Sequence, residues 1–175
     1  MCLIDIANKY ESELHDLFFD TWYDEKYKFY HNGYYSSAYV AQDTNFEKHE
    51  FVSLNNSRKV LGYIGYDIDT ARSCVDNLEL INFSNDKFTY GKDVYQALTN
   101  IFEKFNFRKI SFCVVVGNPT ERTYDRWCAK YGGRVVGIKK NEVKLMDNRY
   151  YDLKLYEILL DDYIFRITKR ARILS

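Results

Sequence analysis

Apolar and polar residues first alternate with the period of a helix and then with that of strands. An apolar stripe at helical spacing predicts a helix over about residues 8–30. Its members are Leu14, Leu17, Phe18 and Trp22. Three extended stretches follow at 46–54, 59–69 and 74–83, separated by short polar segments. Such short connections favour an antiparallel meander.

The middle of the chain predicts a helix followed by a buried strand. From Gly91 to about Asn106, apolar residues again recur at helical spacing. Residues 110–116 form a short, valine-rich run that suits a strand covered on both faces. A helix between two strands makes at least one strand pair parallel.

A further helix and a hairpin close the predicted fold. Asn118 suits an N-cap, and Pro119 suits the first helical position, where a missing N–H costs nothing. The glycine pair at 132–133 allows the positive φ that ends such a helix. Two extended stretches, 134–145 and 150–159, then flank a turn and predict a last hairpin.

Length and charge limit the class of protein. The chain has 175 residues, enough for one domain with a substantial core. Its 25 basic residues equal its 25 acidic ones, so we expect neither nucleic acid nor an anionic membrane as a partner. The chain has no basic leader and no apolar run of about 18 residues. We therefore expect a soluble, cytoplasmic protein.

Cysteine and histidine usage indicates no metal site. The four cysteines lack CxxC spacing and suit reduced thiols that pack in the interior. The three histidines are scattered, with no ligand pair at a usable spacing. These residues are Cys2, Cys74, Cys113, Cys128, His15, His31 and His49.

The predicted element order, with the segments at 90–98 and 127–133, resembles the GNAT acetyltransferase superfamily. The resemblance covers residues 1–160 and implies a single α+β domain. Its sheet would be mixed, mostly antiparallel, with about six to seven strands, helices on its flanks and a final hairpin. Residues 161–175 would be a basic and apolar tail, either a short helix packed on the body or an arm that binds a partner.

The resemblance implies an N-acetyltransferase that moves an acetyl group from acetyl-CoA to an amine by direct attack. A small-molecule or peptide amine would be the acceptor, no metal would be needed, and a homodimer stays open. Two other interpretations remain: a degenerate GNAT-fold protein that acts through protein contacts, and an unrelated α+β binding domain. Tyrosines that either line an acceptor pocket or simply pack are Tyr23, Tyr27, Tyr30, Tyr34 and Tyr35.

In the family, backbone amides of a glycine-rich loop at a helix start hold the pyrophosphate of acetyl-CoA. Residues that the resemblance assigns to this loop are Tyr90, Gly91 and Lys92. Asp93 and Tyr95 stand where small residues are usual. Either the loop is shifted in register, with Lys87 and Lys92 supplying charge, or acetyl-CoA binds weakly or not at all. Gly91 also suits a plain turn that begins a helix.

The rest of the implied donor site lies on two strands. Backbone N–H groups near Ile81 and Phe83 would polarise the acetyl carbonyl. Val115 and Asn118 would line the donor on the opposite strand and its following turn.

Three side chains are candidates for the chemistry. Glu79 lies on the strand where the family often has its general base, although an exposed strand glutamate is an equally simple interpretation. The family's tyrosine that protonates the leaving thiolate aligns with Cys128, and Tyr124 lies one helical turn earlier. We expect Tyr124 rather than Cys128 to act as the acid, and both also suit a buried helix stripe.

Overall fold

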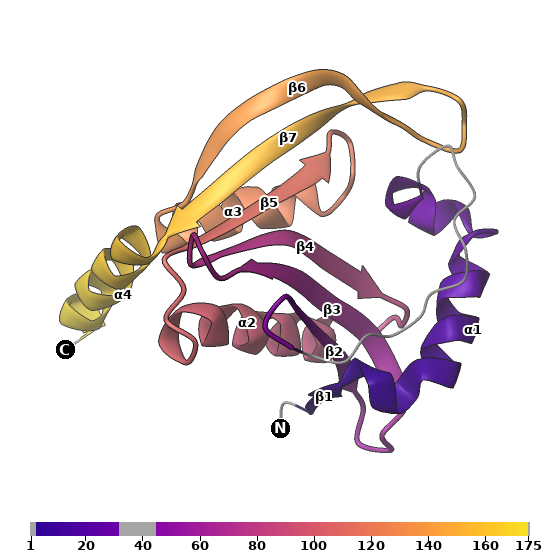
Figure 1. Ribbon diagram of the computed structural model, residues 1–175, viewed down its shortest axis with the longest axis horizontal. Coiled ribbons are helices and arrows are strands. Elements are labelled where there is room, and N and C mark those ends of the chain that lie inside the picture. The colour runs from indigo at the N-terminus through magenta and orange to yellow at the C-terminus, as the bar shows by residue number, and fades with distance from the viewer. Residues whose placement is uncertain (1–2, 32–44, 175) are drawn as a thin grey trace.

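The computed structural model describes residues 3–31 and 45–174. Among these residues, seven strands form one sheet in the order β1-β2-β3-β4-β5-β7-β6. The strands are β1 (Ile4–Ile6), β2 (Lys48–Leu54), β3 (Val60–Asp69), β4 (Cys74–Asn82), β5 (Lys109–Val115), β6 (Arg134–Lys144) and β7 (Tyr150–Leu159). Of the strands described, only β4 and β5 pair in parallel. The sheet is therefore mixed and mostly antiparallel, as predicted (Figure 1).

The α-helices are α1 (Glu11–Thr21), α2 (Lys87–Glu103), α3 (Glu121–Tyr131) and α4 (Leu160–Leu174). Two 3₁₀ segments, η1 (Ala7–Tyr10) and η2 (Glu25–Tyr30), flank α1. Among the described residues, no helix is both long and apolar enough to cross a membrane.

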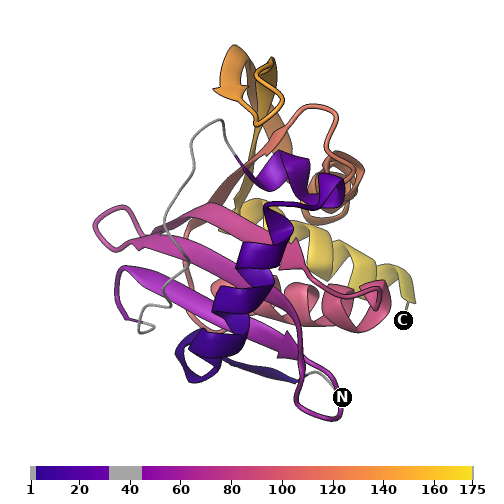
Figure 2. The same cartoon turned by 90° about the vertical axis from the view of Figure 1, so that its right-hand side faces the viewer.

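Alternation along the strands divides the core between the two faces of the sheet. Ile64 and Tyr66 of β3 belong to a large cluster that includes buried side chains of α2, α3 and α4. Tyr63 and Val52 point the other way and pack with Leu14 of α1. Figure 2 shows α2 and α4 on the same side of the strands, with α1 crossing in front. The sheet face that α1 covers therefore has less helical cover than the face that packs against α2, α3 and α4.

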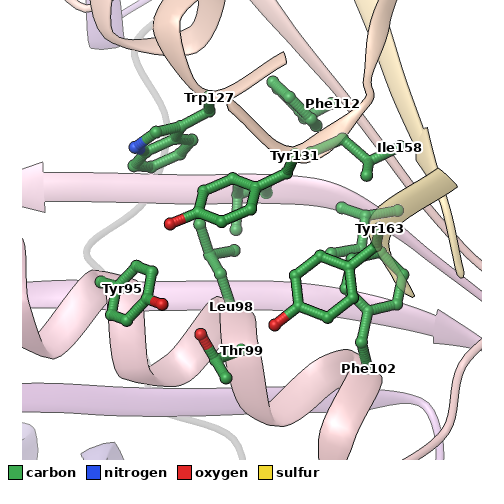
Figure 3. Close-up of a pocket in the computed structure, with 11 residues that line it drawn as sticks. Tyr95, Leu98, Thr99, Phe102, Phe112, Trp127, Tyr131, Ile158 and Tyr163 are labelled. Carbon is green, nitrogen blue, oxygen red and sulfur yellow. The ribbon is translucent and has the colours of Figure 1, made fainter. Parts of the chain in front are cut away.

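Helix α4 follows β7 directly and contributes to the larger cluster. The Tyr163 ring stacks on Phe102 of α2, with 4.6 Å between ring centroids, and lies 5.7 Å from Tyr131 of α3. Figure 3 shows these rings around a small apolar cavity of about 20 Å³. The cavity has room for about one water-sized sphere, so it is a packing defect rather than a ligand site.

The first predicted helix, 8–30, is wrong as a single element. α1 ends at Thr21, and the chain re-forms as η2 after a turn, because Asp24 caps the new segment by accepting the Lys26 N–H at 2.9 Å. The Tyr27 hydroxyl donates to the Asn82 carbonyl at 3.0 Å and anchors η2 to β4.

Helix α2 begins at Lys87 and not at Gly91. Asp86 is its N-cap, and its carboxylate accepts the Thr89 N–H at 2.9 Å. Aspartate is among the strongest N-cap residues, and this signal outweighs the glycine as a start. Gly91 consequently lies about one turn inside the helix.

Helix α3 begins two residues later than predicted, and its end was predicted correctly. The Asn118 side chain accepts the Thr120 N–H at 2.9 Å within a turn, so Pro119 precedes the helix instead of opening it. Gly132 has φ +81° and ends α3 in the left-handed conformation. The final hairpin, β6 with β7, is confirmed.

Candidate active site

Strands β4 and β5 pair only where they begin. Their register joins Cys74 to Lys109 and Val75 to Ile110, and beyond these pairs the two strands diverge (Figure 1). A cavity of about 410 Å³ lies at this divergence, which is within the usual range for a small-molecule site. We call it the β4–β5 cleft.

The cleft is lined from both strands and from the segments that cover them. Its walls come from α1, η2, β4, β5, α3 and β7. The lining residues are Phe18, Trp22, Phe29, Tyr30, His31, Leu78, Glu79, Leu80, Ile81, Cys113, Val114, Val115, Asn118, Thr120, Tyr124 and Leu153. Glu79, Ile81, Val115, Asn118 and Tyr124 were predicted site residues, so the fold brings five of them together.

A bulge in β4 precedes the cleft. The register of β3 with β4 shifts between Gly65 and Asp67, where Asn77 has φ +51°. The Asn77 amide donates to the Asp67 carboxylate at 2.7 Å and holds this conformation. Such a bulge bends a strand and increases its twist, which is consistent with the early separation of β4 from β5.

Along β4, the backbone amides of Ile81 and Phe83 face β3, and those of Leu80 and Asn82 face the opposite edge. Phe83 N–H donates to Leu61 O at 2.9 Å and is therefore engaged with β3. Successive residues of an antiparallel strand direct their backbone groups to opposite edges. The Asn82 backbone accordingly faces away from β3, and its carbonyl accepts the Tyr27 hydroxyl. The predicted roles of Ile81 and Phe83 as amide donors do not fit this geometry, since the backbones of both residues face β3.

Glu79 reaches the cleft from β4 with an exposed side chain. Its strand neighbours Leu78 and Leu80 turn to the opposite face and pack in the larger cluster. Protein surrounds the Glu79 carboxyl closely enough that desolvation raises its pKa, while the Lys48 ammonium opposes the shift. A raised pKa suits a carboxylate that must take up a proton near neutral pH.

The sheet face beside Glu79 is acidic. The fully buried Glu50 carboxylate accepts the Tyr63 hydroxyl at 2.5 Å and pairs with the Lys48 ammonium at 3.3 Å. Glu50 and Asp67 both act to raise the pKa of Glu79, so the three carboxylates share one electrostatic environment.

Tyr124 lines the cleft from α3 and is 4% exposed. Its ring packs edge-to-face on Phe112, with 4.9 Å between ring centroids, and lies 5.2 Å from Trp127. Desolvation raises the pKa of Tyr124 well above its ordinary value. The hydroxyl therefore stays protonated at neutral pH, as a proton donor must.

Cys128 lies in the core instead. It belongs to the larger cluster, and it is absent from the described residues that line the cleft. Burial raises the pKa of its thiol to about 11, which makes it a poor thiolate. A Cβ on Gly133 would lie 2.9 Å from Cys128 Sγ, which shows how tightly the thiol is packed.

The predicted pyrophosphate residues lie on α2 and not at its start. The Tyr90 hydroxyl donates to the Tyr63 carbonyl at 2.9 Å, so Tyr90 anchors the helix to β3. Gly91 is exposed, and a Cβ there would meet nothing within 4 Å. The Lys92 ammonium lies 4.1 Å from the centroid of the Phe88 ring. None of these three is among the described residues that line the cleft.

Several residues of the cleft were not among those predicted from the sequence. Cys113 exposes its thiol there, and desolvation raises the pKa of that thiol. His31 stacks on Trp22 with 3.9 Å between centroids and bonds to Thr21 through Nε2 at 2.8 Å. Alternation along β5 could have placed Cys113 beside Val115, whereas the approach of η2 to α3 is a tertiary feature without a local signal.

The structure shows no metal-ligand cluster among the described residues and places one of the candidate acceptor tyrosines in the cleft. Within residues 3–31 and 45–174, no group of three or more His, Cys, Asp or Glu side chains is placed to hold a metal ion. Of the five tyrosines considered for an acceptor pocket, Tyr30 lines the cleft. Tyr34 and Tyr35 lie outside the described residues.

Comparison with solved structures identifies the architecture. Spermidine N-acetyltransferase from Vibrio cholerae in complex with CoA and spermine superposes with a TM-score of 0.65 at 18% identity, covering 93% of this chain and 98% of that one. Spermidine/spermine N-acetyltransferase SpeG from Vibrio cholerae in complex with manganese ions gives a TM-score of 0.65 at 18% identity, over 94% and 96% of the two chains. The chain has the GNAT fold. No known family profile and no curated protein sequence matches it.

Acetyl-CoA has two parts that can be compared with this site: the acyl-pantetheine arm and the diphosphate. The β4–β5 cleft has the volume and the apolar walls for a pantetheine arm with its acyl group. The start of α2 fits a pyrophosphate poorly, because the Asp86 carboxylate already occupies the Thr89 N–H. The fit therefore holds for the thioester end of the donor and not for its diphosphate.

Proposed function

We propose that this chain is an N-acetyltransferase that transfers an acetyl group from the thioester of acetyl-CoA to an amine. The observation that carries the proposal is the β4–β5 cleft, which brings Glu79 and Tyr124 to one cavity from different elements. The structural likeness to an acetyltransferase solved with CoA and spermine supports it. The donor supplies an activated acyl group, and the protein supplies proton transfer and orientation.

Glu79 takes the role of general base. An amine attacks only with its lone pair free, so a proton must leave the nitrogen before or during attack. The carboxylate of Glu79 accepts that proton, directly or through a water molecule, and its raised pKa improves its strength as a base. The new C–N bond forms as the carbon–sulfur bond of the thioester breaks.

Tyr124 takes the role of general acid. The electron pair of the breaking carbon–sulfur bond goes to sulfur, and the Tyr124 hydroxyl donates the proton that converts the thiolate into a thiol. Its burial keeps the hydroxyl protonated until this step. The backbone N–H of Leu80, which lines the cleft, is the candidate to polarise the thioester carbonyl, in place of those of Ile81 and Phe83.

The acceptor that best suits the cleft is a cationic amine. Glu79, Glu50 and Asp67 give this sheet face negative character, which favours protonated amines and raises their local concentration. The similar spermidine N-acetyltransferase from Vibrio cholerae was solved with CoA and spermine, which is consistent with a polyamine acceptor. Peptide amines remain the second candidate class.

The proposal is tested by following thiol release from acetyl-CoA with a panel of amines: spermidine, a monoamine and a lysine peptide. We expect release above the rate without amine, fastest with spermidine, and acetylated amine in equal amount by mass spectrometry. A Tyr124→Phe variant serves as the control for adventitious aminolysis. Absence of amine-dependent release across the panel would overturn the proposal.

The second candidate function is a GNAT-fold protein that acts through protein contacts without catalysis. The specific observation in its favour is the start of α2, where no glycine occurs between Phe83 and Asp86. Under this function the protein would release no thiol, yet Glu79→Gln and Tyr124→Phe would leave its partner binding intact.

A further inference from the structure

Most backbone N–H groups at the connection between β4 and α2 are already hydrogen-bonded within the protein. The connection spans Phe83 to Asp86, and side chains or carbonyls of the same segment accept the N–H groups that a bound phosphate would need. These bonds are Asp86 N–H to Ser84 Oγ at 3.1 Å, Lys87 N–H to Asn85 O at 3.0 Å, and Thr89 N–H to Asp86 Oδ1 at 2.9 Å. The Ser84 N–H in turn donates to Leu61 O at 3.1 Å.

A carboxylate therefore stands where the helix dipole would favour an anion. The Thr89 N–H bond lowers the pKa of Asp86, so its negative charge is present at neutral pH. A diphosphate at this point would meet a like charge and would have to displace the cap. Lys87 and Lys92 are exposed on the same helix, and salt screens their attraction as it screens the Asp86 charge, whereas the hydrogen bond from the Thr89 N–H to Asp86 does not depend on salt in this way.

The β4–β5 cleft, unlike the start of α2, offers a favourable environment to the acyl-pantetheine half of the donor. Ile81, Val114 and Leu153 provide apolar walls, and among the described strands β4 has no partner on its β5-facing edge beyond Val75. Pantetheine is a flexible arm with amide groups along its length, and such amides can pair with an unpartnered strand edge. Recognition of the arm thus needs no contact at α2.

We infer that this protein recognises its donor through the acyl-pantetheine arm, so that a pantetheine thioester without the nucleotide diphosphate binds as well as acetyl-CoA. The inference rests on the proposed function, because it specifies the donor class of the same cleft. The absence of a glycine cradle, the self-bonded turn and the anionic cap all point to the same specificity.

Calorimetry on the full chain tests the inference with two ligands, acetyl-CoA and S-acetylpantetheine, at low and at high salt. We expect S-acetylpantetheine to bind at least as tightly as acetyl-CoA, with a difference of no more than about fivefold that shrinks at high salt, since no diphosphate contact is gained and salt screens the Asp86 charge. Acetyl-CoA binding more than about tenfold tighter would overturn the inference and leave the proposed function standing. Binding of neither ligand would overturn both.

A cap-preserving variant provides the matched control. Asp86→Ser keeps an N-cap oxygen for the Thr89 N–H and removes the negative charge. We expect acetyl-CoA to bind about two- to fivefold more tightly to this variant, with the S-acetylpantetheine affinity unchanged. An acetyl-CoA affinity that is unchanged or lower would contradict the role given to the Asp86 charge.

Discussion

The hydroxyl of Tyr90 donates a hydrogen bond to the backbone carbonyl of Tyr63 at 2.9 Å, and its ring lies over Gly62. This contact fastens α2 to β3 next to the β4–β5 cleft. Tyr90 is 9% exposed, so the ring and the hydroxyl are both withdrawn from solvent. The residue that the sequence placed on a phosphate loop is therefore a structural anchor.

Gly62 and Gly91 should respond in opposite directions to alanine. A Cβ on Gly62 would lie 2.5 Å from Ile81 O and would also clash with the Tyr90 ring, so Gly62→Ala should lower the free energy of unfolding by about 1–3 kcal/mol. Gly91→Ala meets nothing within 4 Å and should raise it by up to about 1 kcal/mol through helix propensity. Urea denaturation measures both, and a destabilised Gly91→Ala variant would contradict the helical placement of this residue.

The cap of α2 should be measurable in the same way. Asp86→Ala removes the acceptor of the Thr89 N–H and should lower the free energy of unfolding measurably. Asp86→Ser should recover most of this loss. Equal stability of Asp86→Ala and the parent chain in urea denaturation would show that α2 starts elsewhere.

Tyr124→Phe should separate chemistry from packing. The substitution keeps the ring that contacts Phe112 and removes the proton donor, so kcat for acetyl transfer should fall by about 100-fold or more with little change in KM or in stability. Cys128→Ala is the control, because Cys128 packs in the core and should leave kcat within about twofold. The reverse pattern in steady-state kinetics would assign the acid to Cys128.

Glu79 should set the acidic limb of the pH profile. The general base must be ionised, so kcat/KM should fall as the pH drops through the pKa of Glu79. Desolvation raises that pKa, and the limb should therefore lie above the range of an ordinary glutamate. Glu79→Gln should lower the plateau and abolish the limb. If the Glu79→Gln variant keeps an acidic limb at the same pH as the parent enzyme, another group is responsible for the titration.

The fold was largely predictable because its strands and helices follow local patterns. The meander at β2–β4 and the hairpin of β6 with β7 follow from alternation and turn chemistry. Strand β5 was predicted to be covered on both faces, which is wrong, because Cys113 is exposed while Phe112 and Val114 are buried. Gly132 also ended α3 as expected, since only a residue tolerant of positive φ suits that position. The three-residue β1 carried too short a pattern to be predicted.

The site was less predictable because it depends on where helices start and on which strand edge stays open. The predicted start of α2 at Gly91 overlooked Asp86, which is a strong N-cap. Because α2 begins at Lys87, the three residues assigned to the pyrophosphate loop, Tyr90, Gly91 and Lys92, lie within the helix and away from the cleft. Glu79, Ile81, Val115, Asn118 and Tyr124 were found by element order, which the fold preserves. Tyr30, His31 and Trp22 reach the cleft only through the packing of η2 and α1 against the sheet.

The position of the thioester donor in the β4–β5 cleft can be tested by filling the cleft and measuring acetyl-CoA binding by calorimetry. Cys113→Trp places an indole at a lining position of β5, and Ser111→Trp places the same group two residues away, outside the residues that line the cleft. If the donor lies in the cleft, Cys113→Trp weakens acetyl-CoA binding by more than about tenfold, while Ser111→Trp changes it by less than about threefold. Undiminished binding to Cys113→Trp would show that the donor lies elsewhere.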